Sequence, residues 1–122
     1  GLPVLGVLGW REEELQTNMN YRYPGGKVGI LLLEETGENF PEVSANPETV
    51  RLSDGIQIYG KLRGFDKVLV EVPCGQKNGK QLQYLLEQLK LQDCPADGVI
   101  LSNGDQKLLD QYYGRKTGRS DQ

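Results

Sequence analysis

Two carboxylates stand where a divalent cation could bind. Asp54 begins the run DGIQIYG, and Glu71 lies inside the next apolar run, VLVEVP. Strands that follow each other through a tight turn are usually neighbours, so we expect the two side chains to converge. Mg²⁺ prefers carboxylate oxygens, lowers the pKa of a bound water and stabilises a phosphoryl transition state. The pair therefore predicts a Mg²⁺ site with Asp54 and Glu71 as its ligands.

Each carboxylate also has a purely structural interpretation. Asp54-Gly55 is a common turn dipeptide, because Asp bonds its own backbone and Gly accepts the left-handed conformation. Glu71 shares a strand face with Leu69, opposite the three valines of the same run. It could therefore be a solvated residue on an open face of the sheet.

The absence of histidine limits the possible chemistry. No residue of the 122 is a histidine, which excludes Ser-His-Asp and Cys-His catalysis, imidazole proton transfer and His-ligated zinc. Cys74 and Cys94 are too few for a structural zinc site, which needs four ligands of this kind. We expect both to be reduced, which indicates an intracellular protein, cytoplasmic or nuclear.

Charge is distributed unevenly along the chain. Residues 1–48 contain eight acidic and three basic side chains, whereas residues 49–122 contain nine acidic and eleven basic ones. Duplex binding needs several Lys or Arg side chains together, so the acidic first half argues against a broad face for nucleic acid. No apolar run approaches the ~18 residues of a membrane span, so no membrane association is expected.

Apolar runs of strand length recur between turn residues. One of them, KVGILLLEE, is continuously apolar, which is typical of a strand covered on both faces. A short strand is also expected within residues 2–9. The segments expected to form the sheet core are residues 28–33, 56–62, 68–72 and 98–101.

The clearest helix follows Pro73. The leucines of GKQLQYLLEQLKLQ recur at i, i+3, i+4 and i+7, which predicts an amphipathic helix over residues 79–91. Further helices are expected over 11–19 and over 105–113, the second capped by Asp105.

The order of these segments predicts the class of the fold. We expect a single domain over residues 1–114 and a flexible basic tail over 115–122. The domain is expected to be α/β or α+β, with a mixed sheet of about five strands and two to three helices.

Segment order and the two carboxylates resemble those of the PD-(D/E)XK nuclease superfamily. That family has the core order α-β-β-β-α-β, onto which residues 11–102 can be laid. Its Asp corresponds to Asp54 in SDGI, and its (D/E)-x-K triplet falls on Glu71, Val72 and Pro73. The resemblance implies Mg²⁺-dependent phosphodiester hydrolysis and association with nucleic-acid processing.

The chain departs from the family pattern at the catalytic lysine. In the family this lysine positions and activates the attacking water, and Pro73 stands in its place here. Lys77 or Lys80, just downstream, is the candidate to replace it. An atypical or degenerate nuclease-like domain is therefore the function that the resemblance implies.

Two alternatives remain open. The first is a non-catalytic interaction or assembly domain of a larger intracellular protein, with a protein partner in place of nucleic acid. The second is an RNA-associated Sm-like fold, which LSDGIQIYGKLRGFD resembles in the spacing of its glycines, apolar residues and Asp66. The family's RNA-contacting Asn falls on Val70 in that alignment, and the helix after Pro73 does not suit a five-stranded barrel.

Overall fold

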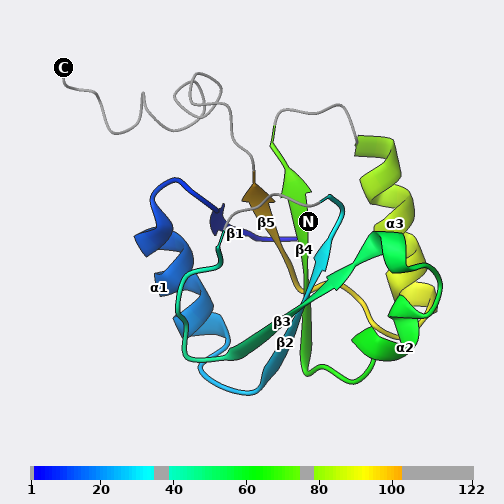
Figure 1. Ribbon diagram of the computed structural model, residues 1–122, viewed down its shortest axis with the longest axis horizontal. Coiled ribbons are helices and arrows are strands. Elements are labelled where there is room, and N and C mark those ends of the chain that lie inside the picture. The colour runs from blue at the N-terminus through cyan, green and yellow to red at the C-terminus, as the bar shows by residue number, and fades with distance from the viewer. Residues whose placement is uncertain (1, 35–38, 75–78, 103–122) are drawn as a thin grey trace.

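A parallel β-sheet between two layers of helix forms the core of the protein (Figure 1). The structure is a computed structural model that describes residues 2–34, 39–74 and 79–102. Five strands lie in the order β1-β5-β4-β2-β3, and each neighbouring pair is parallel. Their bounds are β1 Val4–Val7, β2 Lys27–Leu32, β3 Asn46–Arg51, β4 Lys67–Pro73 and β5 Gly98–Ser102.

This arrangement confirms the predicted α/β class and the number of strands. The strand directions differ from the expected mixed sheet, because all five strands run the same way. Parallel strands require a crossover connection that returns the chain to the amino edge of the sheet, and each connection between successive strands is long enough to do so.

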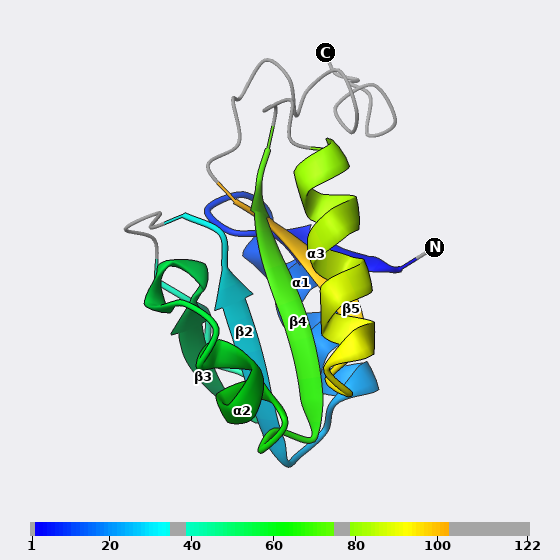
Figure 2. The same ribbon diagram turned by 90° about the vertical axis from the view of Figure 1, so that its right-hand side faces the viewer.

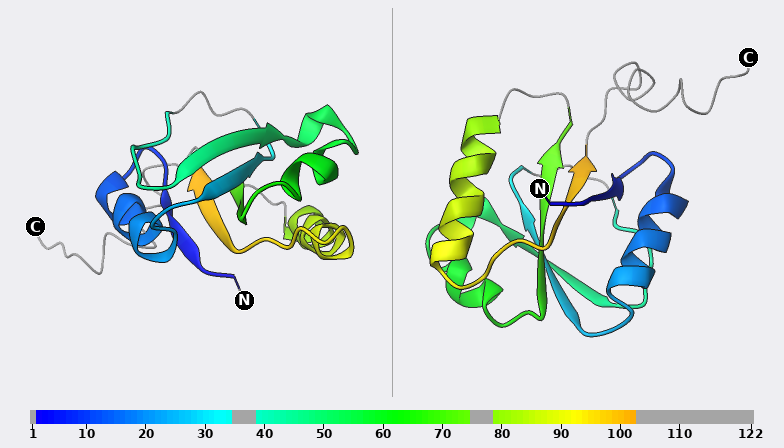
Figure 3. Two further views of the ribbon diagram at one scale, coloured as in Figure 1. Left: turned by 90° about the horizontal axis from the view of Figure 1, so that it is seen from below. Right: turned by 180° about the vertical axis from the view of Figure 1, so that it is seen from behind.

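Within the described residues, three α-helices cover the two faces of the sheet. Helix α1, Glu12–Arg22, lies on one face, and helices α2, Ile58–Leu62, and α3, Gly79–Leu91, lie on the other (Figure 1). Figure 2 shows α2 toward β2 and β3, and α3 toward β4 and β5. The view from below in Figure 3 shows the same three layers. No helix within the described residues is long and apolar enough to cross a membrane.

The central strand β4 alternates as its sequence predicts. Val68, Val70 and Val72 pack in the cluster beneath α2 and α3, whereas Leu69 packs in the cluster beneath α1. Glu71 follows Leu69 by two residues and therefore faces the α1 side. The predicted helices over 11–19 and 79–91 are present as α1 and α3. The helix expected over 105–113 and the tail over 115–122 lie outside the described residues.

The strand predicted over residues 56–62 is wrong. These residues form a turn and then α2, with Ile58 and Leu62 buried four positions apart on one helical face. A strand would point Ile56 to the same side as Ile58, but Ile56 is 88% exposed. A helix at this position, together with the parallel sheet, also excludes the Sm-like barrel.

Two aspartates at the amino ends of the strands fix the register of the sheet. Asp66, just before β4, donates its N–H to Lys27 O and accepts the Lys27 N–H at Oδ2, both at 2.9 Å. Asp97, just before β5, does the same with Val68, at 2.7 Å to the carbonyl and 2.9 Å from the N–H. Each aspartate thus ties its own strand to the first residues of the neighbouring one.

Replacement of Asp97 by Ala is expected to destabilise the protein by about 1–3 kcal/mol, because the part-buried Val68 N–H then loses its partner. Asp97→Asn keeps one acceptor oxygen and is expected to cost less. Urea unfolding of both variants measures the difference, and Asp54→Ala is the control because Asp54 is exposed. Equal stability of Asp97→Ala and wild type would show that the hydrogen bond between Asp97 and Val68 does not stabilise the sheet.

Helix α1 approaches β1 closely at Gly6. A Cβ atom at Gly6 would lie 2.7 Å from Cβ and 2.9 Å from Cα of Leu15, which is fully buried. Asn18 holds the same contact, because its Nδ2 donates to Leu5 O at 2.8 Å. Only glycine therefore lets the helix backbone pack at this distance.

Gly6→Ala is expected to lower the unfolding free energy by about 1–3 kcal/mol, since helix α1 must move away from the strand. Gly25→Ala is the matched control, because no atom lies within 4 Å of a Cβ at that position. The control should change stability by less than about 0.5 kcal/mol. Denaturant melts of the two variants should differ; coincident curves would show that the helix can shift without cost.

Candidate functional site

The carboxyl ends of all five strands meet at one edge of the sheet (Figure 3). The chain leaves β4 through α3, over one face, to reach β5 on one side. From β2 the chain continues to β3, which lies on the side of β2 away from β4. Phe40 and Val43, between these two strands in the sequence, pack over the face that α1 covers. Strand order therefore reverses between β2 and β4. In open α/β sheets, ligands bind outside the carboxyl ends of the strands at such a switch point.

Glu71 lies directly at this switch point. It pairs in register with Leu32 of β2 on one side and with Ile100 of β5 on the other, two residues before β4 ends. Its side chain is only 4% exposed. The interpretation of Glu71 as a solvated residue on an open face is therefore wrong. Removing a carboxylate from water costs several kcal/mol before any partner compensates for it. A buried Glu at this position therefore has a consequence for the free energy of folding.

Ser102 is a second buried polar residue at the same edge. It pairs with Pro73, so it shares a sheet face with Glu71, one strand across and two residues further along. Ser102 is 0% exposed, and its Oγ has no hydrogen-bond partner among the described residues. A buried hydroxyl in this state costs about 1–3 kcal/mol, which a bound ligand would relieve.

The sequence analysis did not single out Ser102. Its signal is a polar residue near the carboxyl end of an apolar strand, which occurs as Glu71 in KVLVEVP and again as Ser102 in GVILS. A single Ser at a strand end is common, however, and only the register shows that it lies beside Glu71.

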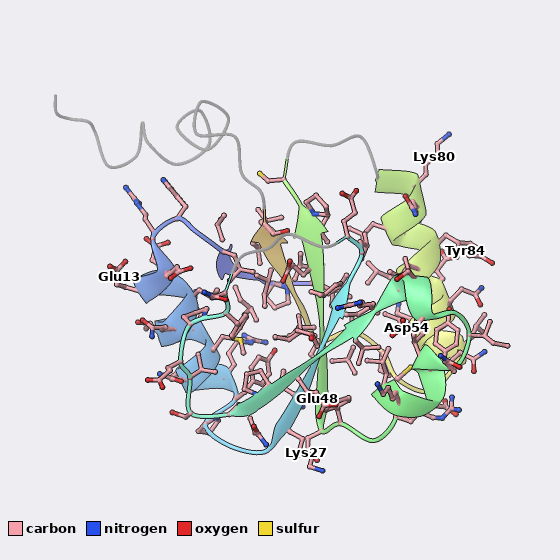
Figure 4. All side chains as sticks on the ribbon, viewed as in Figure 1. Glu13, Lys27, Glu48, Asp54, Lys80 and Tyr84 are labelled. Carbon is pink, nitrogen blue, oxygen red and sulfur yellow. The ribbon has the colours of Figure 1, made fainter. Side chains whose placement is uncertain are left out.

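Asp54 lies apart from Glu71. It ends a short 3-10 turn, Leu52–Asp54, beyond β3 and is exposed to solvent (Figure 4). Strand β2 separates β3 from β4, so the expectation that the two carboxylates sit on adjacent strands is wrong. The connection between them is the α2 crossover and not a hairpin. Their role as Mg²⁺ ligands stays a prediction, and the described residues contain no group of three His, Cys, Asp or Glu side chains that could hold a metal ion.

Of the two candidate lysines, only Lys80 lies within the described residues. Lys80 is exposed in the first turn of α3, and Figure 4 shows its side chain extending away from the molecule. Lys77 lies outside the described residues. The side chain of Lys80 is therefore not placed beside Glu71.

A small hollow of about 140 Å³ lies at the opposite, amino edge of the sheet. Its polar groups serve the fold: Asp66 and Asp97 bond strand N–H groups, and Arg63 Nη1 donates to Gln92 O at 2.8 Å just past the end of α3. Burial raises the pKa of the Cys94 thiol in this hollow, which disfavours the nucleophilic thiolate. Within the described residues, Cys74 and Cys94 are not joined in a disulfide.

Comparisons of the chain with protein-family models, with curated proteins and with solved structures found no match. The carboxyl edge at the switch point, with Glu71 and Ser102, is the site that the geometry itself identifies.

Proposed function

We propose that the chain is a ligand-binding α/β domain that holds a small polar molecule at the carboxyl edge of its sheet. Glu71 is the main recognition residue, and Ser102 assists it. The observation that carries this proposal is a buried carboxylate located directly at the topological switch point between β2 and β4.

The chemistry of the two side chains supports recognition of hydrogen-bond donors. An ionised carboxylate only accepts, with two oxygens and about four lone-pair sites, while a serine hydroxyl both accepts and donates. Hydrogen bonds to a charged acceptor are roughly twice as strong as those between neutral groups. A ligand with an amine or hydroxyl group facing Glu71 would therefore bind in one defined orientation.

The strands supply a rigid platform for this site. Glu71 lies on the central strand of the sheet, with backbone pairing on both sides, and Ile100 and Leu69 on the same face are fully buried. Side chains on such elements are positioned more precisely than side chains on loops. The apolar neighbours also lower the local dielectric constant, which strengthens a hydrogen bond to the carboxylate.

Mg²⁺-dependent phosphodiester hydrolysis stays a second prediction, inherited from the nuclease resemblance. Glu71 supports it, because a buried carboxylate at a strand end is a suitable Mg²⁺ ligand. It is weakened by Pro73 at the lysine position and by strand β2, which lies between β4 with Glu71 and β3, the strand that precedes Asp54. A Mg²⁺ titration that shifts the NMR signals of residues 54 and 71 together would favour it over simple ligand binding.

The first test maps where small polar molecules bind. Amide NMR signals of the ¹⁵N-labelled protein are followed during titration with a panel of amines, sugars and carboxylic acids. The signals of Leu32, Glu71, Ile100 and Ser102 are expected to shift together. Glu71→Gln keeps the side-chain volume but removes the charge, and should weaken binding about 10- to 100-fold, the equivalent of one charged hydrogen bond.

Two controls accompany this test. Asp54→Asn removes an exposed acid away from the site and should leave binding unchanged. Thermal melts show whether Glu71→Gln still folds; if it does not, Ser102→Ala provides the second variant, with a smaller expected loss of binding. Shifts confined to other parts of the molecule, or absent with every member of the panel, would rule out a site at this edge.

A further inference from the structure

We infer that residues 105–113 form a helix that packs on the α3 side of the sheet, beside α3 and over β1 and β5. These residues lie outside the described part of the chain. Three observations carry the inference: an apolar strip on the described surface, the place where the chain leaves β5, and the amphipathic sequence of the segment. The strip lies on the face opposite to Glu71, so a ligand at Glu71 is not required for it.

An apolar strip lies on this face between α3 and the β1 edge of the sheet. Val4 of β1 pairs with Val99 of β5, which belongs to the cluster beneath α2 and α3. Val4 therefore faces the α3 side, and Leu101, two residues after Val99, faces the same way. A segment packed here would remove apolar surface from water. The strip consists of one half-exposed and four partly buried side chains, Val4, Leu2, Leu82, Leu86 and Leu101.

The flank of α3 that adjoins the strip is apolar. Leu86 precedes the buried Leu89 by three residues and Gln92 follows it by three, so their side chains lie on opposite flanks of the helix. The Gln92 Oε1 atom lies 3.4 Å from Nη1 of Arg63, just past α2, so the Gln92 flank faces α2. Leu82, one turn before Leu86, shares the other flank. Because α3 lies toward β4 and β5, this flank faces β5 and β1 (Figure 2).

The chain leaves the described sheet beside this strip. Strand β5 lies next to β1 and ends at Ser102, and the turn dipeptide Asn103-Gly104 separates it from residue 105. A helix of nine residues is about 14 Å long, close to the roughly 17 Å of a five-residue strand such as β5. On the other face, Leu15 of α1 already packs against Gly6 of β1. A helix that returns over β5 and β1 therefore has its space on the α3 side, as the view toward β1 in Figure 3 shows.

The sequence of the segment fits an apolar surface. In DQKLLDQYY, Asp105 is suited to cap a helix, and the apolar and aromatic residues recur at i, i+1, i+4 and i+5, on one side of that helix. Tyrosine combines an apolar ring with a hydroxyl, which suits the border between a sheet face and solvent. The contacting side is made of Leu108, Leu109, Tyr112 and Tyr113.

The test measures contacts and protection in the full chain by NMR. NOEs are expected from the side chains of Leu109 and Tyr112 to the methyl groups of Val4 and Leu101. The first N–H groups of a helix have no partner within it, so protection is expected from residue 109 onward. The amides of residues 109–113 should exchange with solvent at least about tenfold more slowly than in an unstructured chain.

Val4→Asn is expected to release the helix. Val4 is 50% exposed, so its replacement leaves the buried core of the domain intact. The NOEs should disappear, and exchange of amides 109–113 should accelerate at least about tenfold. Tyr84→Asn is the matched control, because Tyr84 is 65% exposed and extends outward from α3 (Figure 4). The control should change these rates by less than about twofold.

A second pair of variants tests the segment itself. Leu109→Asn replaces a residue of the contacting side, and Gln111→Asn replaces one on the opposite side of the same helix. Leu and Gln have similar helix propensities, so loss of propensity is matched between the two variants. Only Leu109→Asn is expected to shift the methyl signals of Val4 and Leu101 and to abolish the NOEs.

Four results would overturn the inference. Unprotected amides over 109–113 would show that the segment does not dock, and NOEs to Tyr84 or Leu91 would place it on the outer side of α3. NOEs between labelled and unlabelled molecules in a mixed sample would assign the strip to the segment of a second copy. Equal effects of Leu109→Asn and Gln111→Asn would show that the apolar side makes no specific contact.

Discussion

The register of β4 between β2 and β5 is the constraint on which the rest of the structure depends. It is held at the amino edge by paired backbone and carboxylate hydrogen bonds from Asp66 and Asp97. Because side chains alternate along a strand, a slip of one residue would turn Glu71 into the apolar cluster beneath α2 and α3 and would turn the three valines of β4 toward α1. The correct register therefore keeps the hydrophobic core and the candidate site in place together.

The two edges of the sheet have different kinds of polar group. At the amino edge, each carboxylate of the two aspartates bonds a strand N–H, and Arg63 bonds a carbonyl just past the end of α3, so these groups complete the backbone bonding of the fold. At the carboxyl edge, a buried carboxylate and a buried hydroxyl lie where the chain reverses direction across the sheet. The first set stabilises the domain. For the second set, recognition of a ligand is the role that we propose.

Packing of the helices determines which face the site occupies. The close approach of α1 to β1 at Gly6 places this helix, with its acidic first turn, on the face of Glu71 and Ser102. Helices α2 and α3 cover the opposite face, and Lys80 lies in the first turn of α3 there. The acidic first turn of α1 and the first turn of α3, with Lys80, therefore lie on opposite faces of the sheet.

The sequence by itself determined the features that depend on local pattern. The alternation of β4, the amphipathic helix α3 and the exclusion of histidine chemistry follow directly from residue order, because burial on a strand or helix repeats with a fixed period. The run from Ile56 to Leu62 misled, since over seven residues its apolar positions fit a strand as well as a helix; only burial of Ile58 and Leu62 against the sheet distinguishes the two.

Tertiary structure decided the strand order, and with it the site. Asp54 follows β3 and Glu71 lies on β4, the next strand in the chain, but the α2 crossover places β4 on the other side of β2. No local sequence pattern predicts that arrangement. Ser102 shows the converse: it is 31 positions from Glu71 in the chain, but on the neighbouring strand it pairs with Pro73, two residues beyond Glu71. Pairing between distant strands depends on the path of the crossovers and on which faces must be buried, and these are properties of the whole chain.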